Sequence, residues 1–258
     1  MTGEILRLKP EEVARLFAEG KMEVVADYMI ERAKELLGKD FLGVEAIRNM
    51  ESKFEWVGVN VEFAIDNIPV FPYDEQDLKL AKSNGEMVVL RPAGMLSGGR
   101  HVGVTVVKLR DLFQKDPLGK SDPPIFFRDW FDKEDFATKP EELKLGWTIV
   151  KKEVLGGSTD IGWHDRDQLL RQYEAGLKGK SAKNVSVRRR TATEAVYDIM
   201  LYYVNTGDKL LLNMWDLTSS QTSIGNVVSV GGYYKHGLLV SIGSPRISIQ
   251  SGGVCPSR

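Results

Sequence analysis

The sequence predicts an α+β fold, in which a helical N-terminal part precedes a larger part that mixes helices and strands. Three observations predict it. Apolar residues recur at helical spacing over residues 10–37, they alternate with polar or small residues over residues 56–65, and helical spacing returns over residues 191–205. The change of period places the boundary near residue 60. We therefore expect a helical N-terminal region of residues 1–60 and a second domain of residues 61–258.

The N-terminal region is expected to contain three helices. Pro10 suits the first turn of a helix, and Gly20 interrupts the apolar stripe that runs to residue 37. Gly38 is a natural end, because glycine readily adopts the left-handed conformation found after helices. A third short helix is expected over residues 44–50.

The middle of the chain predicts short elements separated by turns. In order they are a strand over 56–65, a helix over 74–83, a strand over 87–92, a turn over 94–101, a strand over 102–109, an irregular proline- and aromatic-rich connection over 114–147, a strand over 146–155 and a polar helix over 164–177. The run 178–190 carries six Lys or Arg residues and no acid. Because no aromatic residues interleave to stack on bases, it favours a solvated connector over a nucleic-acid-binding arm.

The helix over residues 191–205 is specified most fully. Thr191 and Glu194 form the capping-box pattern T-x-x-E, and Gly207 supplies a left-handed stop. Its apolar residues repeat at intervals of three and four, as in a helix that packs on a sheet.

Residues 213–258 differ in composition from the rest of the chain. The only charged residues are Asp216, Lys235, Arg246 and Arg258, against 28% for the whole sequence, and nine residues are Ser and seven Gly. Strands are expected over 226–234 and 237–243, joined as a hairpin by a tight turn. The frame expected to be buried comprises Val227, Val228, Val230, Leu238, Val240 and Val254. A surface of small, uncharged side chains on such a frame predicts a binding surface rather than an active site.

Little in the sequence predicts catalysis. The three histidines do not share metal-ligand spacing, and the single cysteine, Cys255, cannot build a thiolate zinc site. Cys255 is interpreted as a small buried hydrophobe. No nucleotide-binding glycine motif or nucleophile elbow is present. We therefore expect no enzyme activity, no cofactor and no metal. A hydrolase using His164 with Asp165 or Asp167 remains an alternative.

The C-terminal part resembles the variable proteins of diversity-generating retroelements. The resemblance covers residues 188–258 and is carried by E-A-V-Y-D-I at 194–199, N-T-G at 205–207, V-V-x-V-G-G at 227–232 and the closing G-V-C-P-S-R. It implies a C-type lectin fold of the variety shared with formylglycine-generating enzymes, here with a helical N-terminal extension. It also implies a non-catalytic protein, in which error-prone copying at adenines diversifies the 3′ end of the gene. The paired cysteines of formylglycine-generating enzymes and the calcium motifs of animal lectins are absent.

The resemblance also implies which residues vary. Mutated Asn codons give a restricted set of side chains, and the tail holds many of that set, whereas Trp215, Gln221, Lys235 and Gln250 lie outside it. The expected variable, ligand-binding residues are Leu217, Ser219, Asn226, Ser229, Tyr234, His236, Leu239, Ser241, Ile242, Ser244, Arg246, Ile247, Ser248 and Ile249. The expected ligand is a protein or cell-surface molecule, bound through varied contacts as in an antibody paratope.

Charge and hydropathy limit the classes of partner. A formal net charge of −1 does not favour nucleic acid, and no apolar run approaches the length of a membrane span. The first residues lack the basic start and apolar core of a secretory signal. A location in the cytoplasm, or on a virus particle or cell surface reached by another route, is therefore expected. A structural or receptor-binding component of a virus or cell surface is a further alternative, and it can coexist with ligand binding.

Overall fold

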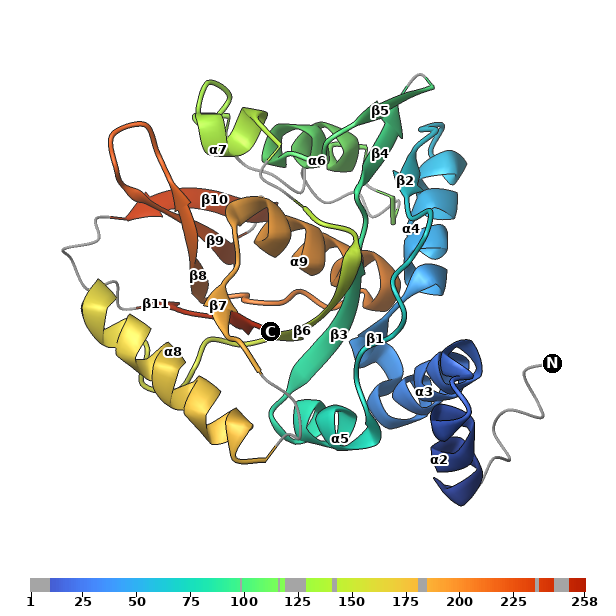
Figure 1. Ribbon diagram of the computed structural model, residues 1–258. Coiled ribbons are helices and arrows are strands. Elements are labelled where there is room, and N and C mark those ends of the chain that lie inside the picture. The colour runs from blue at the N-terminus through green and yellow to red at the C-terminus, as the bar shows by residue number, and fades with distance from the viewer. Residues whose placement is uncertain are drawn as a thin grey trace.

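The fold mixes helices with three β-sheets, as the α+β prediction requires (Figure 1). The computed structural model describes residues 10–97, 99–115, 117–118, 129–140, 143–180, 185–234, 237–243 and 251–258. The helices are α2 (Pro10–Ala18), α3 (Met22–Leu37), the 3-10 turn η1 (Gly38–Asp40), α4 (Val44–Trp56), α5 (Glu75–Ser83), α6 (Val106–Phe113), α7 (Asp135–Thr138), α8 (Trp163–Lys178) and α9 (Ala192–Thr206). The strands are β1 (Phe41–Leu42), β2 (Glu62–Ala64), β3 (Glu86–Arg91), β4 (Gly94–Ser97), β5 (Arg100–Val102), β6 (Gly146–Lys151), β7 (Arg188–Arg189), β8 (Trp215–Gln221), β9 (Val227–Tyr234), β10 (Gly237–Gly243), β11 (Gly252–Gly253) and β12 (Pro256–Ser257).

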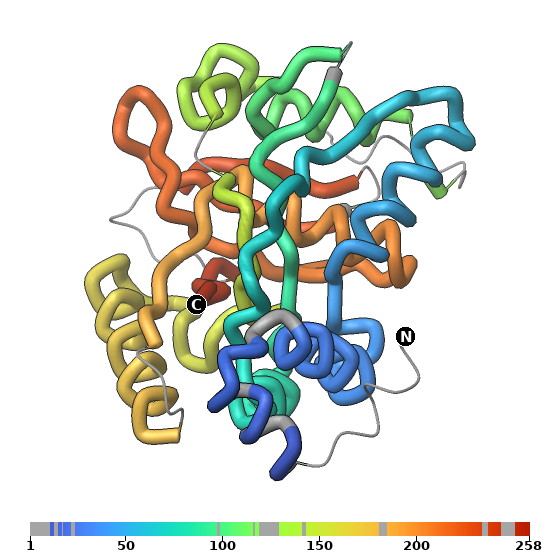
Figure 2. The backbone as a smooth tube through the Cα atoms, turned by 45° about the vertical axis from the view of Figure 1, so that its right-hand side comes forward, coloured from blue at the N-terminus to red at the C-terminus, as the bar shows by residue number. Residues whose placement is uncertain are grey.

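The central sheet has the strand order β1-β3-β6-β12-β7. Its two faces are both buried: Val88 and Ile149 pack with α3 and α5, whereas Met87 and Val150 belong to the main core. The chain end marked C lies in the middle of the molecule in both views (Figures 1 and 2), because β12 is hydrogen-bonded between β6 and β7. The last residues of the sequence therefore complete the central sheet.

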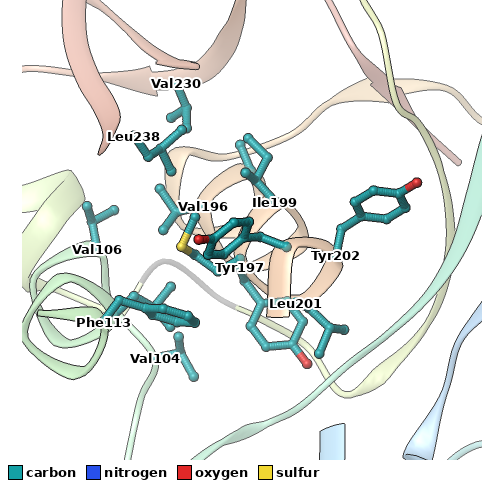
Figure 3. Close-up of a cluster of buried hydrophobic side chains, with 14 of the residues drawn as sticks. Val104, Val106, Phe113, Val196, Tyr197, Ile199, Leu201, Tyr202, Val230 and Leu238 are labelled. Atoms are coloured by element: carbon teal, nitrogen blue, oxygen red, sulfur yellow. The ribbon is translucent and has the colours of Figure 1, made fainter. Parts of the chain in front are cut away.

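Helix α9 is the centre of the main core. Every residue from Ala192 to Val204 is buried, which is the pattern of a helix enclosed on all sides. Figure 3 shows Val196, Tyr197 and Ile199 of this helix among side chains from α6 and from the C-terminal sheet. The predicted capping box is confirmed, since Thr191 and Glu194 each bond the other's backbone N–H, and Gly207 ends the helix with a φ of 76°.

The N-terminal helices follow the prediction closely. Gly20 separates α2 from α3, and Gly38 follows α3 with a φ of 56°. Helix α4 begins at Val44 as expected and continues beyond residue 50 to Trp56. The boundary near residue 60 stays a prediction, although β1 and α4, which precede it, share the central sheet and the main core with later elements.

Three predicted elements of the middle region were wrong. Of the strand expected over 56–65, only residues 62–64 form a strand, β2. The helix α4 continues to Trp56, because the side chain of Phe54 in its last turn is buried in the core. The expected turn over 94–101 is the hairpin of β4 and β5. The expected strand over 102–109 is mainly helix α6, which Thr105 caps by accepting a hydrogen bond from the N–H of Lys108 at 3.2 Å.

Other predicted elements are confirmed with shifted ends. Helix α5 begins after Asp74, which forms a capping box with Asp77. Strand β6 and helix α8 occupy most of their expected ranges. Within the described residues, no helix combines the length and apolarity needed to cross a membrane.

Candidate functional site

The C-terminal sheet has the strand order β10-β9-β8-β11 and contains the predicted hairpin of β9 and β10. The predicted frame is confirmed: Val227, Val228, Val230, Leu238, Val240 and Val254 are all at most 3% exposed. Val228, Val230, Leu238 and Val240 belong to the same core cluster as α9. Apolar packing against α9 therefore holds one face of the sheet, and Val227 and Val254 pack in a second cluster that includes residues of α8.

Steric crowding explains why both final positions of V-V-x-V-G-G are glycines. A Cβ built on Gly231 would lie 2.3 Å from the carbonyl oxygen of Met214, and one built on Gly232 would lie 2.5 Å from the ring of Trp215. Both glycines also have positive φ angles, 144° and 59°, which side chains disfavour. Strand β9 thus passes too close to the start of β8 for any larger residue.

Five of the expected variable residues have side chains that reach solvent. Ser219 and Ile242 are exposed, the latter by 45%, and Asn226, Leu239 and Ser241 are half-buried. Ser219 lies on β8, Asn226 on the turn between β8 and β9, and Leu239, Ser241 and Ile242 on β10. The side chain of Tyr234, together with residues His236, Ser244, Arg246, Ile247, Ser248 and Ile249, lies outside the described part of the chain.

Leu217 and Ser229 correct the expected surface, because both are buried, at 2% and 3% exposure. Leu217 packs with Leu170 of α8 in a small apolar cluster, so that α8 covers this side of the sheet. Ser229 lies on the central strand, in register with Leu217 on one side and Ser241 on the other. Its small side chain is enclosed by these neighbours. Within the described residues, the expected positions that reach solvent are therefore limited to Ser219 of β8, Asn226 in the following turn and the three residues of β10.

A chain of buried ion pairs lies beside this sheet. Arg190 donates to Asp216 through Nε at 2.9 Å and Nη2 at 2.7 Å, and to Asp198 through Nη1 at 3.1 Å. Arg91 also donates hydrogen bonds to Asp198, through Nε at 3.0 Å and Nη2 at 2.7 Å. The other oxygen of Asp216 accepts the N–H of Cys255 at 2.9 Å. These contacts join β3, α9, β8 and the last strand.

Glu194 extends the network toward solvent. It accepts hydrogen bonds from Arg91 and from both terminal nitrogens of Arg188, as well as from the N–H of Thr191 at 2.8 Å. The side chain of Glu194 is 4% exposed, whereas that of Arg188 is 54% exposed. The ionic network therefore begins on the surface at Arg188 and ends inside the protein.

The prediction that residues 178–190 form a solvated connector is therefore wrong for the last two residues. Arg190 is 1% and Arg189 is 8% exposed, so neither belongs to a solvated connector. Arg189 pairs with Asp167 at 2.7 Å and lies 3.6 Å above the ring of Trp163. A sequence signal was present, because a buried carboxylate requires a partner, and Glu194 and Asp198 lie one turn apart on an otherwise apolar helix.

A pocket of about 800 Å³, lined by charged, hydroxyl and apolar side chains, opens beside the network. Its walls come from β6, from Arg188 of β7, from Thr191 at the N-cap of α9, from the end of β12 and from Ser219 and Ser220 of β8. Ser219 is thus both an expected variable residue and part of a concave surface. The sequence patterns did not indicate this pocket, because it joins segments that are far apart in the chain.

The position of Glu194 affects its pKa. Burial alone would raise the pKa of this carboxyl, but the hydrogen bonds from Arg188 and the charges of Arg91 and Arg188 outweigh burial and lower the pKa to about 2. A folded-state pKa below the unfolded value stabilises the fold at pH values above the unfolded pKa. That stabilisation is lost as the pH falls from about 4.5 to about 2.

Glu194→Gln tests this contribution. Glutamine can still complete the capping box but carries no charge. We expect the variant to unfold with a free energy about 3 kcal/mol lower than the unmodified protein at pH 7, and the difference to shrink steadily below pH 4.5. Urea unfolding of both proteins at several pH values measures it. A difference that is constant from pH 7 to pH 2.5 would contradict the assignment.

The alternative catalytic residues do not come together in a pocket. His164 and Asp165 are exposed on the first turn of α8, and Asp167 is held by Arg189. Cys255 is fully buried as interpreted, and burial raises the pKa of its thiol well above the ordinary value. In the described residues, His, Cys, Asp and Glu side chains form no group of three or more that could hold a metal ion. This arrangement argues against the hydrolase alternative.

Comparison with known proteins finds no matching family model, no similar protein among those with curated functions and no solved structure that matches.

Proposed function

We propose that the protein is a non-catalytic ligand-binding protein whose C-terminal surface is diversified by a retroelement. The single observation that carries the proposal is that buried apolar residues stabilise the C-terminal sheet while other residues of the same strands reach solvent. The apolar residues of β9 and β10 that face α9 are buried, while Ser219, Leu239, Ser241 and Ile242 reach solvent and contribute little to the core. A surface that accepts many side chains needs a frame of this kind, because its stability must not depend on the residues that vary.

The fixed residues support the same proposal. The close approach of Gly231 and Gly232 to Trp215 leaves no room for larger side chains, and Asp216 forms a buried ion pair with Arg190. Gly231 and Gly232 fall between the expected variable positions Ser229 and Tyr234, and Trp215 and Asp216 directly precede Leu217. Substitution at any of the four would disturb packing or leave a charge buried. As part of the proposal, the α+β architecture is a C-type lectin fold with a helical N-terminal extension.

Diversified proteins of this kind bind through small hydrogen-bonding and apolar side chains together. The exposed Ile242 would supply apolar area, and Ser219 and Ser241 would supply adaptable hydrogen bonds. A protein or cell-surface molecule is the ligand class that suits such a surface.

Sequencing tests the genetic half of the proposal. Independent copies of the 3′ end of the gene and the DNA downstream of it would be sequenced. We expect a near-identical repeat that differs at adenines, beside a gene for a reverse transcriptase, and variation among copies confined to the exposed positions. An invariant 3′ end with no repeat would refute diversification.

Substitutions at two neighbouring leucines test the structural part of the proposal, which is that the positions expected to vary contribute little to stability. Leu239→Ala and Ser241→Tyr are expected to change the free energy of unfolding by no more than about 0.5 kcal/mol, as surface substitutions do. Leu238→Ala, one residue away but fully buried, should lower it by about 2–5 kcal/mol. Thermal and urea unfolding measure both. Equal losses from Leu239→Ala and Leu238→Ala would show that the exposed positions belong to the core after all.

A further inference from the structure

The pocket of about 800 Å³ beside α9 is lined by charged residues that the proposed function does not explain. Its charged lining residues are four cations, Arg91, Lys144, Arg188 and Arg258, and one acid, Glu194. Glu194 and Arg91 are buried and bonded to each other, and Arg258 is paired with Glu86 at 3.0 Å. The charged side chains that reach solvent at the pocket are therefore Lys144 and Arg188, and both are positive.

Arg188 is positioned rather than free to move. Its two terminal nitrogens hold Glu194, and Nη1 also donates to the carbonyl of Arg189 at 3.1 Å. Among the described residues, none accepts a hydrogen bond from its Nε or from the second N–H of Nη2, and 54% of the side chain is exposed. Two charged N–H groups thus remain on a side chain that the network holds in place.

The remaining walls suit an organic acid. Ser186 is an exposed lining residue with a hydroxyl, whereas the hydroxyl of Ser219 donates to the carbonyl of Arg190 at 3.1 Å. Leu145 and Trp147 provide half-buried apolar surface. Carboxylates bind guanidinium groups through charge-assisted hydrogen bonds. Two N–H groups of Arg188 remain for a ligand and match the two oxygens of a carboxylate. The apolar surface of Leu145 and Trp147 favours an organic anion over inorganic phosphate.

We propose that this pocket binds a carboxylate, either of a small organic acid or of an acidic side chain on a protein ligand. Arg188 makes the charged contact, and Ser186, Leu145 and Trp147 contact the rest of the ligand. The inference rests on fixed side chains and does not require diversification. Because Ser219 belongs both to the pocket and to the expected variable surface, the pocket would supply a constant anchoring contact next to variable ones.

Binding to the full chain would be measured by calorimetry at low ionic strength. The probes are glutarate, a capped tri-glutamate peptide, a capped tri-glutamine peptide and inorganic phosphate. We expect saturable binding of glutarate or tri-glutamate that weakens as salt screens the charges, and much weaker binding of tri-glutamine and phosphate. Binding of glutarate indicates a small acid as ligand, whereas binding of tri-glutamate alone indicates an acidic segment of a protein.

Three variants locate the site. Arg188→Gln should weaken carboxylate binding at least tenfold. Ser186→Glu, which places a competing carboxylate at the pocket without touching the ion pairs, should do the same. Arg100→Gln makes the same change of charge on exposed strand β5 and should bind like the unmodified protein. Unchanged thermal unfolding of Ser186→Glu separates loss of binding from loss of fold.

The proposal is overturned if neither acid binds, if phosphate binds more tightly than glutarate and tri-glutamate, or if Arg188→Gln and Ser186→Glu bind like the unmodified protein. These outcomes are independent of the sequencing test. Invariant gene copies with Arg188-dependent binding would leave the carboxylate site and remove diversification. Variable copies without carboxylate binding would do the reverse.

Discussion

Arg190→Ala is expected to lower the free energy of unfolding by about 3–5 kcal/mol, because it leaves the buried carboxylate of Asp216 without its cation. Asp216 is 1% exposed, and among the described residues the N–H of Cys255 would be its one remaining hydrogen-bond donor. Asp198 would lose one of its two guanidinium partners. Equilibrium unfolding in urea measures the loss, and near-ultraviolet circular dichroism reports whether the C-terminal sheet stays packed.

Two further variants make this result specific. Arg190→Lys keeps the charge but cannot reach two carboxylates with a planar fork, so an intermediate loss is expected. Lys139→Ala removes an ion pair with Asp135 in which both side chains are more than 70% exposed, and it should cost less than about 1 kcal/mol. If Arg190→Ala were no more harmful than Lys139→Ala, the network could not be what holds α9 to the two sheets.

Phe113→Ala is expected to lower the free energy of unfolding by about 3–5 kcal/mol, because it opens a cavity in the main core. Phe113 is fully buried on α6, and its ring lies 4.9 Å from that of Phe54 in an edge-to-face arrangement. Figure 3 shows it beside Val104 and Val106. Thermal and urea unfolding would give the change.

The adjacent residue is the control for Phe113. Leu112 lies on the same helix but is only half-buried, so Leu112→Ala should cost clearly less than Phe113→Ala. Similar losses for the two variants would mean that α6 does not present its Phe113 face to the core.

Helix α6 shows where prediction from sequence stopped. The run Val104 to Val107 contains β-branched residues that are typical of strands, and the alternation before it suggested one continuous strand. The cap at Thr105 and the burial of Leu109 and Phe113 on one helical face override that preference. Helix α9 was predictable because its cap, its apolar spacing and its terminal glycine all agree.

The candidate site was predictable in part for a similar reason. Alternation along β9 and β10 identified the buried valines, because it depends only on the chain near them. It could not place Ser229 and Leu217 inside, since their burial depends on neighbouring strands and on α8. The ion pairs of Arg91 with Asp198 and of Arg190 with Asp216, and the position of β12, join segments more than 20 residues apart, for which local patterns carry no information. The pairs of Arg188 with Glu194 and of Arg190 with Asp198 are local, and the carboxylates on apolar α9 indicated them.

The position of β12 has a consequence for the order in which the molecule assembles. Residues 256–257 are hydrogen-bonded to β6 and β7, more than 60 residues earlier in the chain. Contacts between distant segments slow folding, because a long loop must be closed before they form. During synthesis, the central sheet remains divided between β6 and β7 until these residues leave the ribosome. Any protein whose synthesis stops before residue 256 would therefore present two unpaired strand edges, which favour aggregation.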